Sequence, residues 1–158
     1  MADVMILMGS KSDLAIGEKA VKTLNSLGVS NELHVASAHR TPAYVEELVK
    51  ERGAKVFIGM AGVAAALPGV IAAMTTKPVI GVPVGGKVPF DSLLSIVQMP
   101  PGIPVATVGV DRGDNAGFLA AQILAANDEA LAARLVAQRA AAAEKVLADD
   151  ASLSTEMA

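Results

Sequence analysis

Short apolar runs alternate with longer segments of helical periodicity along most of this chain. The first run covers residues 4–8, is apolar throughout and ends at Gly9, which is typical of a central strand in a parallel sheet buried on both faces. Over residues 13–27, apolar residues recur at helical spacing, and Gly28 follows as a helix C-cap. The alternation predicts strands at residues 4–8, 32–37, 55–61, 78–82 and 105–110, separated by helices at residues 13–27, 42–52, 64–75, 91–98 and 115–126.

Strands separated by helices of this length form parallel sheets with right-handed crossovers and helices on both faces. We therefore predict an α/β fold of the three-layer, doubly wound (flavodoxin-like) class, with a mostly parallel sheet. The chain has 158 residues, which is the size of a single domain. We expect the α/β core of that domain to span about residues 3–126.

An alanine-rich segment at residues 128–148 predicts a C-terminal helix beyond this core. Its apolar stripe is narrow, and so narrow a stripe rarely holds a helix against its own subunit alone. We therefore expect the helix to pack on a neighbouring subunit. The stripe consists of Leu131, Leu135, Val136, Val146 and Leu147.

The composition argues against several classes of protein. The formal net charge is -3 without a run of basic residues, and aromatic residues make up only 3% of the chain, so a nucleic-acid partner is not expected. The absence of cysteine excludes disulfide scaffolds and thiolate metal sites and is compatible with a cytoplasmic location, which we expect. The apolar stretch at residues 56–84 is broken by Gly, Pro and Lys77, which argues against a membrane span.

In doubly wound folds, ligands bind beyond the carboxyl ends of the strands, so the residues that follow each strand are candidates for a site. After the first strand, Gly9 permits a sharp turn, Ser10 and Ser12 offer hydroxyls, and the next helix presents free N–H groups to an anion. Asp13 would repel a phosphate, so it either caps the helix or accepts hydrogen bonds from sugar hydroxyls. The glycine spacing of Walker loops and dinucleotide-binding motifs is absent, which disfavours ATP and NAD.

A histidine and an arginine, His39 and Arg40, follow the second predicted strand. Imidazole titrates near neutral pH and guanidinium stays charged, so the pair suits proton transfer on an anionic substrate. Thr41 and Pro42 are the predicted N-cap and first residue of the next helix. The other histidine, His34, lies inside a predicted strand and is more typical of a structural residue with satisfied hydrogen bonds.

The other strand ends carry less chemistry. Residues 60–69 contain no titratable group, and their small side chains suit either the close approach of a flat ligand or tight packing of a helix on the sheet. After the last strand, Asp114 or Asn115 is a natural N-cap. No metal site is predicted, because the acidic residues are scattered, cysteine is absent and the histidines lack ligand spacing.

Four motifs follow one another between about Val4 and Leu131. They are Gly9-Ser10-Lys11-Ser12-Asp13, Ser37-Ala38-His39-Arg40-Thr41-Pro42, Ala65-Ala66-Leu67-Pro68-Gly69, and the stretch DSLLSIVQMPPGIP at residues 91–104. In this order and register, they resemble the carboxyaminoimidazole ribonucleotide mutases of purine biosynthesis, in the family of the class I phosphoribosylaminoimidazole carboxylase catalytic subunits.

The resemblance implies an enzyme that moves a carboxyl group from the exocyclic nitrogen of an aminoimidazole ribonucleotide to a ring carbon, without ATP, metal or organic cofactor. In such an enzyme His39 would carry the proton between nitrogen and carbon while carbon dioxide is held as a bound intermediate. The resemblance also implies a homo-octamer whose C-terminal helices reach neighbouring subunits. It assigns the phosphoribosyl group to Ser10, Ser12, Asp13 and Arg40, and the base to Ser37, Ala61, Gly62 and Leu67, with Ala38 as a further substrate contact.

Two features depart from the pattern of this family. Its members usually have a second histidine immediately before Leu-Pro-Gly, where this chain has Ala66, and the loop at residues 85–90 is shorter than its usual counterpart. A related branch carboxylates the unmodified ribonucleotide directly and typically has lysine after the histidine, so Arg40 and the stretch Gln98-Met99-Pro100 favour the mutase. The alternatives are that direct carboxylase and a non-catalytic nucleotide-binding protein, which Ala66 alone supports.

Overall fold

A five-stranded parallel sheet forms the centre of the protein, in a computed structural model that describes residues 2–156. Its order is β2-β1-β3-β4-β5, the order of flavodoxin-like doubly wound sheets, which confirms the predicted fold class. In the register of the sheet, Ile6 pairs with Leu33 on one side and with Ile58 on the other. The strands are β1 (Val4–Met8), β2 (Asn31–Val35), β3 (Val56–Ala61), β4 (Val79–Pro83) and β5 (Ala106–Thr107).

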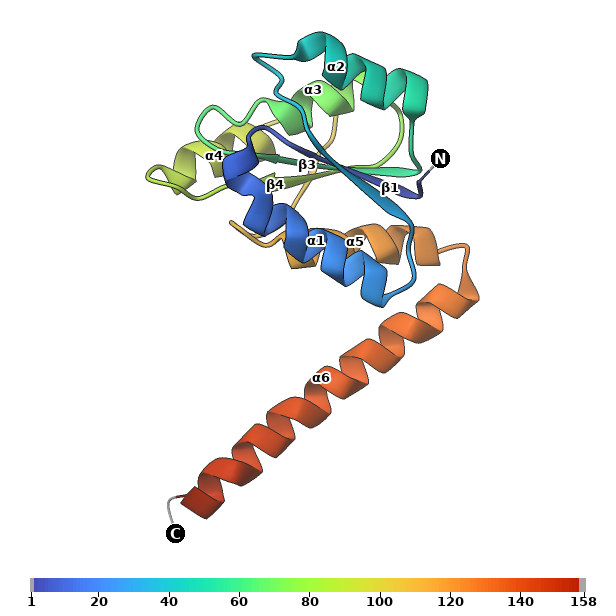
Figure 1. Ribbon diagram of the computed structural model, residues 1–158, viewed down its shortest axis with the longest axis vertical. Coiled ribbons are helices and arrows are strands. Elements are labelled where there is room, and N and C mark those ends of the chain that lie inside the picture. The colour runs from blue at the N-terminus through green and yellow to red at the C-terminus, as the bar shows by residue number, and fades with distance from the viewer. Residues whose placement is uncertain (1, 157–158) are drawn as a thin grey trace.

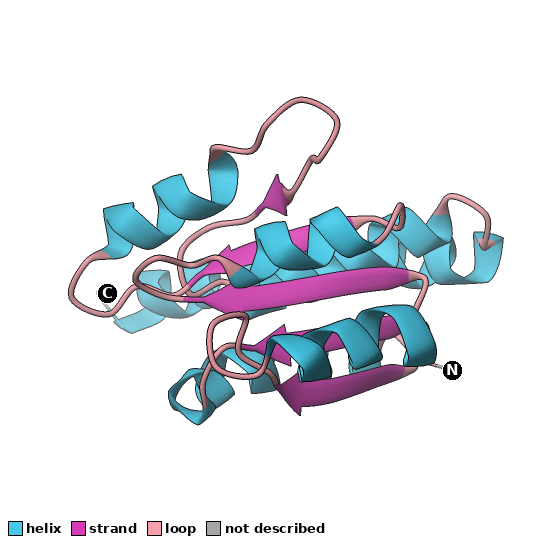
Figure 2. Cartoon of the chain, turned by 90° about the horizontal axis from the view of Figure 1, so that it is seen from above, coloured by secondary structure: helices cyan, strands magenta, loops and turns pink. Residues whose placement is uncertain are grey.

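Helices cover both faces of this sheet, as Figures 1 and 2 show. On one face lie α1 (Leu14–Ser26) and α5 (Gly113–Ala125), and on the other lie α2 (Pro42–Glu46), α3 (Leu67–Met74) and α4 (Pro89–Val97). A 3₁₀ turn, Lys11–Asp13, leads into α1. A π-helical turn, Glu47–Arg52, continues α2 until Gly53 ends it with a φ of 65°.

The apolar run of strand β1 is unbroken because both faces of the strand are buried. Val4, Ile6 and Met8 belong to the core beneath α1 and α5, whereas Met5 and Leu7 belong to the core beneath α2, α3 and α4. Each of these side chains is at most 1% exposed. Truncation of one of them, as in Ile6→Ala, is therefore expected to lower the free energy of unfolding by about 2–5 kcal/mol.

Two elements, α3 and β5, are much shorter than predicted. Helix α3 begins at Leu67 because the chain first makes a turn, closed by a hydrogen bond of 3.0 Å from the Ala65 N–H to the Gly62 carbonyl, and Pro68 then suits the first helical turn. Strand β5 contains only two residues. Beyond β5, isolated hydrogen bonds from Val108 and Asp111 to β4 carbonyls keep the chain beside β4 without continuing the ladder.

Helix α6 (Glu129–Glu156) continues beyond the predicted end at residue 148 and extends away from the core (Figure 1). Its first turns are anchored: Asp128 accepts from the Leu131 N–H at 2.9 Å, Leu131 is 2% exposed, and Arg134 Nε donates to the Leu27 carbonyl at 2.8 Å. Leu131 and Leu135 thus pack on the core of their own subunit, so the expectation that the stripe packs on a neighbour is wrong for them. The exposed Val136, Val146 and Leu147 lie farther along, and for them packing on a neighbouring subunit stays a prediction. Within residues 2–156, neither α6 nor any other helix is long and apolar enough to cross a membrane.

Candidate active site

A cavity of about 410 Å³ lies at the carboxyl edge of β1, β2 and β3, and the three loops that follow these strands line it. Neighbouring strands β1 and β3 lead to helices on opposite faces of the sheet, so the cavity sits where doubly wound folds place their ligands. Every residue predicted for the site lines this cavity, although contact with a ligand stays a prediction for each. These residues are Ser10, Ser12, Asp13, Ser37, Ala38, His39, Arg40, Ala61, Gly62 and Leu67.

The serine loop after β1 orders its own polar groups around the cavity. Ser10 Oγ accepts from the Ser12 N–H at 3.3 Å and thereby caps the 3₁₀ turn. Asp13 occupies the N-cap position of α1, yet its side chain makes no capping hydrogen bond. Instead its buried carboxylate accepts from Ser12 Oγ at 3.0 Å and lines the cavity. The expectation that the Asp13 side chain caps the helix is therefore wrong, and the expectation that it accepts hydrogen bonds from sugar hydroxyls stays a prediction.

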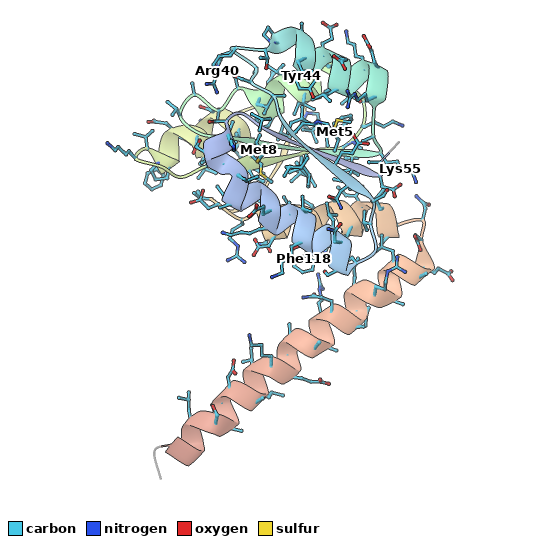
Figure 3. All side chains as sticks on the ribbon, viewed as in Figure 1. Met5, Met8, Arg40, Tyr44, Lys55 and Phe118 are labelled. Carbon is cyan, nitrogen blue, oxygen red and sulfur yellow. The ribbon has the colours of Figure 1, made fainter. Side chains whose placement is uncertain are left out.

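Arg40 joins the serine loop to the loop after β2 (Figure 3). Its Nη2 donates to the Gly9 carbonyl at 2.7 Å, and its Nε donates to Ser37 Oγ at 3.3 Å. The same Ser37 hydroxyl accepts from the Arg40 backbone N–H at 3.2 Å. A guanidinium carries five donors, so the Arg40 side chain retains N–H groups for an anion in the cavity after making these bonds.

Thr41 is the N-cap residue of α2 and Pro42 is its first residue, as predicted, but the Thr41 side chain does not cap the helix. Its Oγ1 makes no capping hydrogen bond; it accepts from the Ser37 N–H at 2.9 Å and donates to the Ser37 carbonyl at 3.2 Å. A further backbone hydrogen bond of 2.9 Å runs from the Thr41 N–H to the same carbonyl. These hydrogen bonds close residues 37–41 into a ring, with His39 in its middle. They pair backbone groups of the loop that lie beyond the end of β2, where no neighbouring strand is available as a partner.

The two histidines have opposite environments. His39 is exposed at the cavity, and within residues 2–156 its ring has no hydrogen-bond partner. His34 lies 3.2 Å from Glu32 Oε2 through its Nε2 and 3.4 Å from the Tyr44 hydroxyl through its Nδ1, with the Tyr44 ring edge-on to it. The prediction that His34 is a structural residue is confirmed. The ring of His39 is the one that is free to exchange a proton with a ligand.

The segment after β3 forms an apolar wall that contains no titratable side chain. Packing accounts for some of its small residues, because a Cβ atom on Gly69 would lie 3.3 Å from the Met99 side chain, whereas the close approach of a flat ligand stays a prediction. At Gly59, inside β3, a Cβ atom would lie 3.1 Å from Pro68 Cα, so this glycine serves the packing of α3. Gly62 lines the cavity instead. Val63, which the sequence reasoning did not single out, also lines it and has a φ of 54°.

The segment after β5 plays no part in lining this cavity. The N-cap of α5 is Arg112 rather than Asp114 or Asn115. Asp114 pairs with Arg112 Nη2 at 2.8 Å. Burial raises the pKa of Asp114, but the hydrogen bonds from Arg112 and from the Asn115 N–H outweigh it and hold that pKa below its usual value. Asp111 Oδ1 accepts from the Gly85 N–H at 2.9 Å and supports the base of the loop at residues 85–90.

Other hollows lie outside the predicted site. One of about 580 Å³ is lined by charged side chains but by no histidine, and these side chains are Asp3, Lys55, Asp128, Glu129 and Arg134. Among residues 2–156, no three His, Asp or Glu side chains gather as a metal site would require. A larger hollow of about 1050 Å³ lies near residues 72–79, before β4, at the opposite edge of the sheet from the predicted residues. Its cationic side chains are Lys50, which pairs with Glu46 at 2.7 Å, and the exposed Lys77.

Comparison with known proteins identifies the family of the chain. Residues 3–145 match the family model described as "AIR carboxylase". The chain is 60% identical to the N5-carboxyaminoimidazole ribonucleotide mutase of Methanocaldococcus jannaschii, over 93% of this chain and 94% of that protein. It is 52% identical to the enzyme of the same name from Bacillus subtilis, over 91% of this chain and 93% of that protein. A crystal structure of Treponema denticola PurE superposes with a TM-score of 0.84 at 31% identity, covering 95% of this chain and 97% of that one. The resemblance carried by the four motifs is thus confirmed, and the chain belongs to the AIR carboxylase family.

Proposed function

We propose that the protein is an N5-carboxyaminoimidazole ribonucleotide mutase of de novo purine biosynthesis. It moves the carboxyl group from the exocyclic nitrogen of the aminoimidazole ribonucleotide to a ring carbon. The mutases of M. jannaschii and B. subtilis, at 60% and 52% identity, support this activity. The observation that carries the proposal is the convergence of the serine loop, the histidine-arginine loop and the apolar wall on one cavity of about 410 Å³.

The serine and arginine loops bind the phosphoribosyl group in this proposal. The Ser10 hydroxyl offers a donor to the phosphate, Ser12 offers a second when its hydroxyl turns away from Asp13, and Arg40 supplies a positive charge that the short bond to Gly9 holds in place. Asp13 accepts from the ribose hydroxyls, which removes the objection that a carboxylate repels phosphate. A crystal structure with the product nucleotide should place its phosphate between the two loops, and phosphate bound elsewhere would refute the assignment.

His39 carries the proton of the reaction. The bond between the exocyclic nitrogen and the carboxyl carbon breaks, carbon dioxide is released into the cavity, and the nitrogen takes a proton from the imidazolium. The ring carbon then attacks the carbon dioxide, and the imidazole removes the proton which that carbon carried. The steps balance without an oxidant, a reductant or ATP. Ser37, Ala38, Ala61, Gly62 and Leu67 surround the base and exclude water, which keeps the carbon dioxide from escaping.

A single histidine suffices for this sequence of steps. The position before Leu67 is Ala66, which lines the cavity and offers no proton carrier. The proton that His39 delivers to nitrogen and the one that it accepts from carbon pass through the same ring at different times, so one imidazole ends the cycle in the state in which it began.

A side-by-side assay of two substrates tests the proposed activity. The protein should convert the carboxylated ribonucleotide without added bicarbonate. The absorbance of the carbon-carboxylated product measures this reaction. The opposite pattern, with turnover only of the unmodified ribonucleotide plus bicarbonate, would assign the protein to the direct carboxylases. Nucleotide binding without turnover in either assay would identify a non-catalytic binding protein.

The chain acts as a single α/β domain in a homo-octamer in the cytoplasm, with α6 packed on neighbouring subunits. The exposed stripe on α6, which includes Val136 at 70% and Leu147 at 69% exposure, supports this assembly. A chain that ends at Ala137 keeps the anchoring contacts of Leu131 and Arg134 and should form a smaller oligomer in light scattering. A full-length protein that is a monomer at working concentration would contradict the assembly.

A further inference from the structure

Val63 has a backbone conformation that β-branched residues rarely adopt. Its φ is 54°, in the left-handed region where a side chain crowds the following carbonyl group. Among the described non-glycine residues, only Asp111 shares a positive φ, and an aspartate tolerates that region far better than a valine does. Val63 occupies the first central position of the turn that the hydrogen bond between Ala65 N–H and the Gly62 carbonyl closes at 3.0 Å. Glycine or asparagine usually fills such a position.

The Val63 side chain gains little from its own subunit in return for this strain. It is 68% exposed, and it belongs to neither of the two apolar cores of the described residues. Water therefore surrounds most of an isopropyl group that a strained backbone holds in position. Strained residues of this kind occur mainly where a ligand uses the conformation.

The position of Val63 in the cavity indicates which part of a ligand its side chain would meet. Val63 lines the same cavity as Ser10, His39 and Arg40, on the apolar wall that continues to Leu67. Ser10, Ser12, Asp13 and Arg40 account for the phosphoribosyl group in the proposed function, and the wall after β3 faces the flat base together with Ser37 and Ala38. An apolar side chain at the rim of that wall removes water from the face of an aromatic ring when the ring binds.

We propose that Val63 is a specificity-determining residue whose isopropyl group covers the aminoimidazole ring of the bound nucleotide, and that the left-handed turn exists to hold it over the cavity. This inference rests on the proposed function, because it takes the flat ring from that substrate. Val63 then contributes to the affinity for the base and nothing to the affinity for the ribose phosphate. It touches no proton in the reaction, so its contribution appears in KM and leaves kcat nearly unchanged.

Two substitutions separate the side chain from the strain. Val63→Thr keeps the shape, the β-branching and the strained backbone but exchanges a methyl group for a hydroxyl. Val63→Asn relieves the strain, because asparagine tolerates the left-handed region, and it also removes the apolar surface. Val97, which is 50% exposed on α4 outside the cavity, provides the matched control as Val97→Thr.

Calorimetric titration with the carbon-carboxylated product nucleotide and, separately, with ribose 5-phosphate measures the effect on full-length protein. We expect the Kd of the nucleotide to rise about threefold in Val63→Thr and about tenfold in Val63→Asn, with KM following it. The Kd of ribose 5-phosphate should stay the same in both variants, and Val97→Thr should change neither constant. The midpoint of thermal unfolding should stay unchanged in Val63→Thr and rise by about 2–4 °C in Val63→Asn.

Three outcomes overturn the proposal. The first is an unchanged nucleotide Kd in both variants. The second is a smaller oligomer in light scattering of Val63→Asn, because it would assign the side chain to a contact between subunits. The third is a wild-type protein that binds the nucleotide no more tightly than ribose 5-phosphate, because the base then contributes no affinity. Failure of the proposed function looks different: the wild type would bind the nucleotide through its base and still turn over neither substrate.

Discussion

Two kinds of loop enclose the cavity, and they are built in opposite ways. The loops after β1 and β2 are polar. The bond of 2.7 Å from Arg40 to the Gly9 carbonyl ties them to each other, and the hydrogen bonds between Thr41 and Ser37 close the second loop on itself. The segment after β3 has no titratable side chain and projects Val63 from a strained turn. In the proposed function, side-chain hydrogen bonds therefore position the groups that meet charge and move protons, whereas a backbone turn, closed by the bond from the Ala65 N–H to the Gly62 carbonyl, positions the surface that meets the flat ring. Changes on the polar side should therefore alter turnover and phosphate affinity, and changes on the apolar side should alter base affinity.

The largest effect is expected at the apex of the polar loop. His39→Asn should lower kcat by a factor of about a hundred or more, because it removes the proton carrier but keeps a polar side chain of similar size. Nucleotide affinity and the far-ultraviolet circular dichroism spectrum should remain close to those of the wild type. Rapid single-turnover measurements would check the loss, and a near-normal rate would remove His39 from the mechanism.

Arg40 tests whether the tie between the two loops matters in addition to its charge. Arg40→Ala should weaken the binding of ribose 5-phosphate by a factor of about thirty, since it removes both the charge and the bond to the Gly9 carbonyl. Arg40→Lys keeps the charge, but lysine has no planar guanidinium to reach Gly9 and Ser37 together. The affinity of this variant for ribose 5-phosphate should therefore lie between those of the wild type and Arg40→Ala. Equal affinities of Arg40→Lys and the wild type in calorimetry would mean that charge alone is needed.

Thr41 tests positioning within one loop. Thr41→Val should lower kcat about fivefold at nearly constant KM, because the loss of its hydrogen bonds to Ser37 loosens the ring that presents His39. Thr41→Ser keeps the hydroxyl and should restore most of the rate. If the serine variant were as slow as the valine variant, the hydroxyl would not be what positions the loop.

The smallest effect is expected on the apolar wall, at Ala66. Ala66→His places a second imidazole in the cavity, and because His39 completes the proton cycle in the proposed mechanism, kcat should change by less than about threefold. Steady-state rates with the carboxylated ribonucleotide would check this. A variant that gained activity where the wild type had none would show that the site needs two histidines. Proton transfer would then depend on the segment after β3 as well as on the polar loops.

The sequence allowed much of the site to be predicted, because the predictions relied on local patterns. The apolar run over β1 and the glycines at positions 28 and 53 mark strand and helix ends through backbone chemistry that needs no distant partner. The rule for strand ends in doubly wound sheets then placed Ser10 and His39 at one edge. Thr41 was assigned the wrong hydrogen bond for a related reason: a threonine before Pro42 suits an N-cap and a loop closure equally well, and local sequence does not distinguish them.

Local periodicity and the chemistry of glycine, proline and cap residues determined the parallel α/β architecture and the edge of the sheet on which the proposed site lies, and the resemblance carried by the four motifs supplied most of the residues proposed for it. The tertiary structure alone decided which of these groups touch. Arg40 reaches Gly9 across 31 positions of the chain, and no periodic pattern records a hydrogen bond that forms only after two strands pair. The same holds for Val63, whose positive φ contradicts the preference of valine. Val63 lies in the short turn between β3 and α3, and the packing of these two elements fixes where the turn begins and ends. That constraint exists only in the folded protein.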